Sequence, residues 1–345
     1  MYSSTLTLGA PLAKRLVEDP PNYEGPSGLG WILAADFIVF LPIFLITAYT
    51  LTHVYPTLAA VEDPLPAYEA LPIDDDGTPK PNDEPAHTAQ PGQPITASLR
   101  ATNRLIRSLG GWLANFRGFG YYFLVNLAVI IATGIISTPF FVPSSVGHLL
   151  ALLGTAPLST TWTHVVITAP STKSFSSRIP PVNKVYLATW FPTFLFWAAI
   201  QASVILPTLL AYAIGLNLQT GETPSGSDAG KALAVAGLSL GIQAIFVIPA
   251  HAALARVQAS LLPADEDPLV PFDRSFAGRV EPEIITGKGF ATFGAAIKTI
   301  PRASWIRIYL LRIKVFFVTM AAFSVFGLVL AAEILIAAAI TGNKN

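Results

Sequence analysis

Six apolar segments dominate this sequence, and each is long enough to cross a membrane. A transmembrane helix needs about 20 mainly apolar residues to span roughly 30 Å of hydrocarbon. Only 12% of the 345 residues are charged, against about 25% in soluble proteins. We therefore expect an all-α integral membrane protein with six transmembrane helices. The segments run approximately over Trp31–Tyr55, Phe119–Phe141, Val146–Ala169, Val185–Leu216, Ala232–Ala255 and Lys314–Ile340.

Charge and cysteine content exclude several classes of protein. The 21 Lys and Arg residues balance 21 Asp and Glu residues, so there is no basic excess to neutralise nucleic-acid phosphates. Because the chain has no cysteine, it cannot form disulfides, thiolate metal sites or iron–sulfur clusters. The sequence contains no nucleophile elbow and no glycine pattern typical of phosphate binding. We therefore predict no catalytic residue and no metal site.

The distribution of Lys and Arg predicts the orientation of the helices. The connections over 56–118, 170–184 and 256–312 carry five, three and eight of them, whereas the connection around 139–147 carries none and that around 217–231 only Lys231. Basic loops usually stay on the inner side of a membrane. The three long connections are therefore expected to face the cytosol or matrix, with both termini on the opposite side. The charge distribution leaves three alternatives for the membrane that contains the protein. These are the mitochondrial inner membrane, another intracellular membrane and the plasma membrane.

A shared layout divides the chain behind its N-terminal tail into three units. The first and third units each contain a span, a proline, an acidic loop, a basic amphipathic helix and a second span, and the middle unit is shorter. The acidic loop of the first unit covers 62–84. The tail and the units are residues 1–30, 31–142, 143–228 and 229–345.

Two basic segments are predicted to be amphipathic helices that lie along the membrane surface. They cover residues 98–118 and 289–312. In the first, one face is apolar and another carries arginines, a pattern typical of helices that lie in the interface. Both are expected on the Lys/Arg-rich side of the bilayer.

One motif in the third unit gives the chain a family resemblance. In "PAHAALARVQ", Pro249, Arg256 and Gln258 match the signature P-x-[DE]-x-x-[KR]-x-R-x-Q of the mitochondrial carrier family. The layout of residues 31–340 also resembles that of this three-repeat family. The resemblance implies three helical hairpins, with a hinge proline in each odd-numbered helix at Pro56, Pro170 and Pro249.

The same resemblance implies ion pairs that close the matrix side of the helix bundle. The corresponding stretches of the first and second units, "YPTLAAVED" and "APSTKSFSSR", keep the proline and lose the charges of the signature. A three-way network of ion pairs is therefore not expected here.

Polar residues within the spans indicate candidate sites for a transported solute. Charge inside a bilayer is costly and often functional. Asp36, Glu333 and Lys231 are interpreted as an outer gate or, alternatively, as a structural ion pair. The central parts of the even-numbered spans lack Lys and Arg, which favours a small neutral or amphipathic solute. Asn126 and Gln201 are the candidates to line its path, although bonds between helices also explain them.

Two other functions are left open by the sequence. His53, His164 and His251 lie near the inner ends of the odd-numbered spans and would bind haem axially in a membrane redox protein. The motifs "PPNY" and "LPAY" resemble ligands of WW domains, which implies a membrane adaptor that recruits a WW-domain ubiquitin ligase. Their motif residues are Pro20, Pro21, Tyr23, Leu65, Pro66 and Tyr68.

Overall fold

The computed structural model describes most of the chain, and the described residues are helical apart from turns and loops. These residues are 29–64, 94–138, 142–171, 173, 176–216, 226–280 and 289–342. Within them, one isolated bridge between Thr168 and Pro268 is the only strand-like pairing. The all-α prediction is therefore confirmed for this part of the chain. The N-terminal tail, most of the acidic loop 62–84 and the motifs "PPNY" and "LPAY" lie outside the described residues, so the adaptor hypothesis stays a prediction.

Five long apolar helical runs suit an integral membrane protein, and a sixth predicted span is bent. The predicted span Val146–Ala169 forms two helices, α7 (Ser144–Gly154) and α8 (Ala156–Ile167), which meet at 59°. Counted as one span, this pair brings the number of candidate spans in the described residues from five to six. The five continuous runs are Trp31–Val61, Gly111–Ser137, Val182–Ala213, Gly226–Ser260 and Arg302–Ile336.

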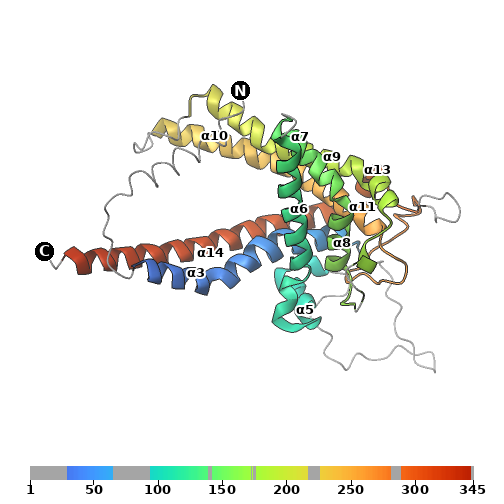
Figure 1. Ribbon diagram of the computed structural model, residues 1–345, viewed down its shortest axis with the longest axis horizontal. Helices are drawn as coiled ribbons and strands as arrows, with labels where there is room; N and C mark the ends of the chain where they lie inside the picture. The colour runs from blue at the N-terminus through green and yellow to red at the C-terminus, as the bar shows by residue number, and fades with distance from the viewer. Residues whose placement is uncertain are drawn as a thin grey trace. The chain divides into compact units, whose positions relative to one another are not determined.

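The chain divides into two compact units, one formed by residues 1–45 and 318–345 and the other by residues 46–317. In the first unit, α3 (Leu29–Leu45) and the C-terminal part of α14 (Arg302–Gly342) run side by side in opposite directions (Figure 1). The Phe44 ring lies 5.2 Å from that of Phe323 and 4.9 Å from that of Phe326. Aromatic packing therefore holds this helix pair together.

The second unit is a helix bundle in which α11 is the central packing element. The α11 helix contacts α4, α8, α9 and α13, and α10 runs beside α9 (Figure 1). The buried apolar core of the second unit includes Leu58, Ile167 and Ile308. Besides α7, α8 and the start of α14, this unit contains η1 (Ile46–Val54), α4 (Tyr55–Val61), η2 (Ile95–Ala97), α5 (Leu99–Ser108), η3 (Gly111–Phe116), α6 (Phe119–Ser137), η4 (Ser176–Arg178), α9 (Val182–Ala213), α10 (Gly226–Ile242), η5 (Gln243–Val247), α11 (Ile248–Ser260) and α13 (Phe293–Lys298).

A proline lies in the first turn of each of three helices, α4, α8 and α11. These prolines are Pro56, Pro157 and Pro249. The π-helical segments η1 and η5 precede α4 and α11, and the 59° bend precedes α8. Because proline has no N–H and crowds the preceding turn, it interrupts the regular hydrogen-bond pattern at each junction. The hinge assignment of Pro170 is wrong, since Pro170 lies in an exposed loop after the end of α8 and Pro157 holds the junction.

Both predicted amphipathic segments are divided in the structure. The segment 98–118 forms α5, capped at its N-terminus by the Ser98 hydroxyl, and then the separate 3₁₀ helix η3. Gly111, the first residue of η3, and Gly118, just after its end, adopt left-handed φ angles of 66° and 72°, which no continuous helix permits. The segment 289–312 is divided at Pro301 into α13 and the start of α14. Its second half is therefore continuous with the last apolar run.

Candidate functional site

A cavity of about 310 Å³ lies inside the second unit, and we refer to it as the histidine cavity. Side chains from η1, α4, α6, α7, α8, α9 and α11 line it. Three of the lining residues are His53, His148 and His251, and none is Asp, Glu, Lys or Arg. A mainly apolar cavity with a few polar groups is the usual form of a small-molecule site.

Hydrogen bonds fix the polar wall of the histidine cavity. The Tyr122 hydroxyl lies 2.8 Å from His53 Nε2, and the Asn126 amide donates to the Tyr122 carbonyl at 2.8 Å. Next to them, Trp162 Nε1 donates to the Tyr49 hydroxyl at 3.1 Å. These bonds hold the side chains of η1, α6 and α8 in fixed positions around the cavity. The polar wall is therefore formed without a ligand.

Gln258 closes one end of the histidine cavity by joining α11 to α8. Its Oε1 accepts a hydrogen bond from the Thr163 hydroxyl at 2.7 Å, and its Nε2 donates to the Ser159 hydroxyl at 3.2 Å. Its carbonyl oxygen lies 2.8 Å from Nε2 of His164, which is buried. The side chains of Gln258, Thr163 and Ser159 all border the cavity. This polar layer therefore separates the cavity from the helix ends beyond it.

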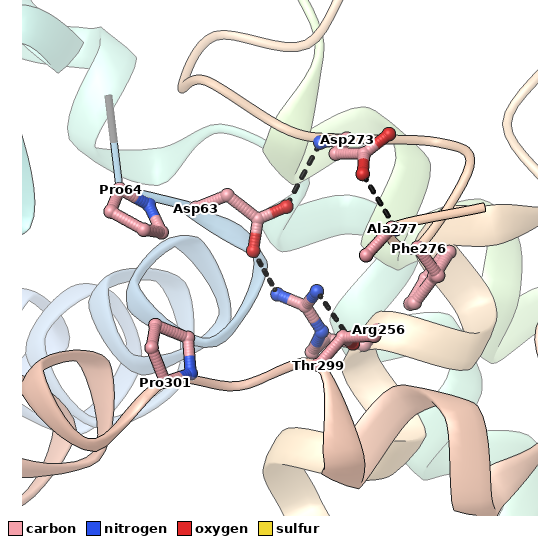
Figure 2. A pocket seen from close by; sticks show the side chains of 8 residues that line it. All are labelled: Asp63, Pro64, Arg256, Asp273, Phe276, Ala277, Thr299 and Pro301. Carbon is pink, nitrogen blue, oxygen red and sulfur yellow. Dashed lines mark hydrogen bonds and ion pairs between the residues drawn. The ribbon is translucent and has the colours of Figure 1, made fainter. Parts of the chain in front are cut away.

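Beyond this layer, a buried ion pair joins α11 to the end of α4 (Figure 2). Arg256 Nη1 lies 2.7 Å from Asp63 Oδ1, and the two side chains are 2% and 15% exposed. The other Asp63 oxygen accepts the backbone N–H of Asp273 at 2.9 Å. The Arg256 guanidinium also donates to Thr299 Oγ1 at 3.3 Å and lies 5.1 Å from the Phe276 ring. The ion pair thus connects α4, α11, the segment before α14 and the loop around 273.

A second buried ion pair holds the same end of α4 to α14. The Glu62 carboxylate accepts the backbone N–H groups of Ile95 at 2.6 Å and Thr96 at 3.0 Å, together with the Thr96 hydroxyl. Arg307 Nη1 lies 3.4 Å from this carboxylate. Arg307 Nη2 also donates to the carbonyl oxygens of Ala59, at 3.2 Å, and Glu62. Because cations favour the carbonyl end of a helix, Arg307 also stabilises the terminus of α4.

Asp273 shapes the loop that borders the Arg256–Asp63 ion pair (Figure 2). One carboxylate oxygen accepts the N–H of Ser275 at 2.8 Å and the other accepts the N–H of Ala277 at 2.7 Å. These bonds hold Phe276 and Ala277 at left-handed φ angles of 51° and 53°. Partial burial raises the pKa of Asp273, but the hydrogen bonds from Ser275 and Ala277 outweigh it, and the pKa lies below its usual value. Asp273 is therefore ionised at neutral pH.

The structure brings some of the predicted solute-path and haem residues together and separates others. Asn126, His53 and His251 line the histidine cavity, whereas Gln201 does not, although its neighbour Ile200 does. His164 lies outside the cavity against the Gln258 carbonyl, so the three histidines of the haem hypothesis do not surround one site. Among the described residues, no three His, Cys, Asp or Glu side chains form a cluster that suits a metal ion.

The predicted outer-gate residues divide into two sets of contacts. In the first unit, the carboxyl groups of Asp36 and Glu333 lie within hydrogen-bonding reach of each other. Lys231 instead lies 3.6 Å from Asp228 on its own helix and donates to the Gly215 carbonyl at 3.3 Å. The participation of Lys231 in a gate with these carboxyl groups stays a prediction.

Sequence reasoning missed the acidic partner of Arg256, although a spacing signal was present. Arg256 and Asp63 are 193 residues apart, and the same separation relates Pro249 to Pro56. Each charge therefore follows its proline by the same number of residues. His164 follows Pro157 by that number too. Glu62 and Arg307 give no comparable signal, because their pairing depends on how α14 packs against α4.

Two comparisons, with protein-family models and with curated proteins, find no match for this chain. The fold defines the structural class of the protein. It is an all-α protein with several long apolar helices that suit an integral membrane protein. A more specific function has to be argued from the geometry of the histidine cavity.

Proposed function

We propose that this chain is a divergent carrier-like membrane protein that moves a small neutral or amphipathic solute through the histidine cavity. The observation that carries the proposal is the arrangement of α4, α8 and α11. These helices line the cavity together, and their far ends are joined by Gln258 and by the Arg256–Asp63 ion pair. A ligand cavity next to a breakable polar layer is what alternating access requires.

The three proline junctions support a six-span arrangement of three related units. Pro56, Pro157 and Pro249 each begin a helix that ends at the polar layer. The bent pair α7 and α8 then counts as the first span of the middle unit. This correspondence adds to the resemblance to mitochondrial carriers, in which each odd-numbered helix contains such a proline.

Opening of the polar layer is the conformational change that the proposal requires. The polar layer and the Arg256–Asp63 ion pair beyond it consist of one ion pair and a few hydrogen bonds, which separate only if new contacts of similar strength form elsewhere. A solute shifts such an equilibrium only by the difference between its affinities for the two states. The junctions at the three prolines lie between the cavity and the preceding helical segments. They are where we place the bending.

Uptake by purified protein in liposomes tests the proposal. Neutral and amphipathic solutes are first screened for those that raise the unfolding temperature of the protein, and these are then tested for uptake. Asn126→Phe fills the cavity and is expected to abolish both stabilisation and uptake. Leu127→Phe is the matched control, because Leu127 is the next residue of α6 and does not line the cavity. Equal uptake by both variants would contradict the proposal.

A further inference from the structure

Among the described residues of the second unit, six arginines are wholly or partly buried, and five of them have evident partners. Arg178 and Arg274 donate hydrogen bonds to carbonyl oxygens of nearby loops. Arg256 and Arg307 pair with Asp63 and Glu62. Arg117 donates to the carbonyl oxygens of Val165, at 2.5 Å, and Thr168 at the end of α8, where a helix carries partial negative charge. The sixth, Arg312, therefore differs from the rest.

Arg312 has no acidic partner in the described part of the chain. Its one hydrogen bond is long, 3.4 Å from Nη1 to the Thr52 carbonyl of the π-helical segment η1. Its Nε is buried and makes no hydrogen bond. A guanidinium in this position has lost water without gaining a counter-ion, which is costly. An anion that reached it would restore the missing interaction.

The charge of Arg312 acts on the wall of the histidine cavity. It interacts electrostatically with His53 and His251, which both line the cavity. Its bond to the Thr52 carbonyl places it against the backbone that leads directly into His53. Since no acidic side chain lines the cavity, the nearest uncompensated charge that a solute meets is positive.

The remaining walls restrict the size and shape of the solute. Apolar side chains of α6, α7, α9 and α11 form much of the lining, among them Val125, Leu152, Phe196 and Leu254. The volume of about 310 Å³ lies at the small end of the range for ligand sites, which is about 300–1,000 Å³. One uncompensated guanidinium matches one negative charge, whereas a nucleotide or dicarboxylate would bring two or more.

We propose that the histidine cavity selects a small amphipathic monocarboxylate, whose apolar body fills the cavity and whose carboxylate is attracted by Arg312. This inference rests on the proposed function and narrows the solute that it requires. Arg312 acts as a selectivity residue from behind the His53 and His251 wall.

Binding of three related probes to the full-length protein in lipid nanodiscs tests the inference. Phenylacetate, phenylacetamide and phenethylamine share an aromatic body and differ in charge. Phenylacetate is expected to bind about tenfold more tightly than phenylacetamide, as expected for one charge-assisted interaction. Phenethylamine is expected to bind most weakly.

Variants of Arg312 identify the source of the preference. Arg312→Gln is expected to bind phenylacetate no more tightly than phenylacetamide, with the affinity for phenylacetamide unchanged. Arg312→Lys should retain most of the difference in affinity between the two probes. The matched control is Lys314→Gln, two residues along the same helix, where Lys314 is exposed and bonded to the Ala97 carbonyl. Asn126→Asp adds a negative charge to the cavity itself and should reverse the order of phenylacetate and phenethylamine. This second variant keeps the test valid if Arg312→Gln does not fold.

The outcomes separate this inference from the proposed function. Equal binding of phenylacetate and phenylacetamide would leave a ligand cavity without charge selectivity and would overturn the inference alone. Failure of all three probes to bind would also overturn it, while reagent access to the cavity would still support the proposed function. A cavity that neither binds a probe nor admits an aqueous reagent would overturn both.

Discussion

Replacing Glu62 by glutamine removes a charge that is 1% exposed and is surrounded by donors. The carboxylate accepts two backbone N–H groups, from Ile95 and Thr96, and one hydroxyl, also from Thr96. A glutamine amide has only one acceptor oxygen, so its NH₂ group would face at least one of these donors. Arg307 would at the same time lose its buried counter-ion. Removing one partner of a buried ion pair costs about 3–5 kcal/mol, and we expect Glu62→Gln to fall in this range.

Unfolding of the purified protein in mixed SDS and detergent micelles, followed by tryptophan fluorescence, measures this loss. Asp265→Asn is the matched control, because Asp265 pairs with Lys173 in an exposed position, where ion pairs contribute little. The control should unfold as the wild type does. The double variant Glu62→Met, Arg307→Met should recover much of the stability, since it leaves no buried charge unpaired. A wild-type unfolding curve for Glu62→Gln would refute the ion pair.

Two further predictions concern the loops. Gly118→Ala should destabilise the protein by about 2–4 kcal/mol, because Gly118 has a φ of 72° and an added Cβ would lie 3.2 Å from the Tyr49 hydroxyl. Gly215→Ala, at a φ of 64° in open space, should cost about 1 kcal/mol; equal losses in the two unfolding curves would contradict the packing. The hydrogen bond that Lys173 Nζ donates to the Asp265 carboxylate lowers the pKa of Asp265 and raises the pKa of Lys173. The protection of these loop amides against hydrogen exchange, measured relative to the intrinsic exchange rate at each pH, should therefore be highest between the two unperturbed pKa values. It should fall as pH drops through the lowered pKa of Asp265 or rises through the raised pKa of Lys173. Protection that did not change with pH in this way would contradict the pairing.

The helices could be predicted from the sequence because long apolar runs leave few alternatives to membrane-spanning helices. The bend between α7 and α8 could not be predicted from the sequence, because an apolar run such as Val146–Ala169 does not show where a helix breaks. Pro157 lies within that run, whereas the sequence pattern predicts the hinge at Pro170, at the end of the run. The local rule that prolines interrupt helices was correct, but the choice between two prolines depended on where the chain turns.

The residues of the site could be predicted only in part. Asn126, the one amide side chain in its apolar run, does line the histidine cavity. Arg312 was counted among the basic residues that orient the protein, and that count contains no information on burial. His164 and His148 have similar apolar surroundings in the sequence, yet only His148 lines the cavity. Such distinctions depend on tertiary packing between helices distant in the chain.

Reagent access to Asn126→Cys tests most directly whether the histidine cavity is an aqueous solute site. The chain contains no cysteine, so a single introduced thiol reports without background. In sealed vesicles, a membrane-impermeant thiol reagent should modify Asn126→Cys from the side opposite the Lys/Arg-rich loops, because the Gln258 layer and the Arg256–Asp63 ion pair close the other side. Leu127→Cys should resist modification from both sides. An Asn126→Cys thiol that is unreactive from both sides, or no more reactive than Leu127→Cys, would contradict the account.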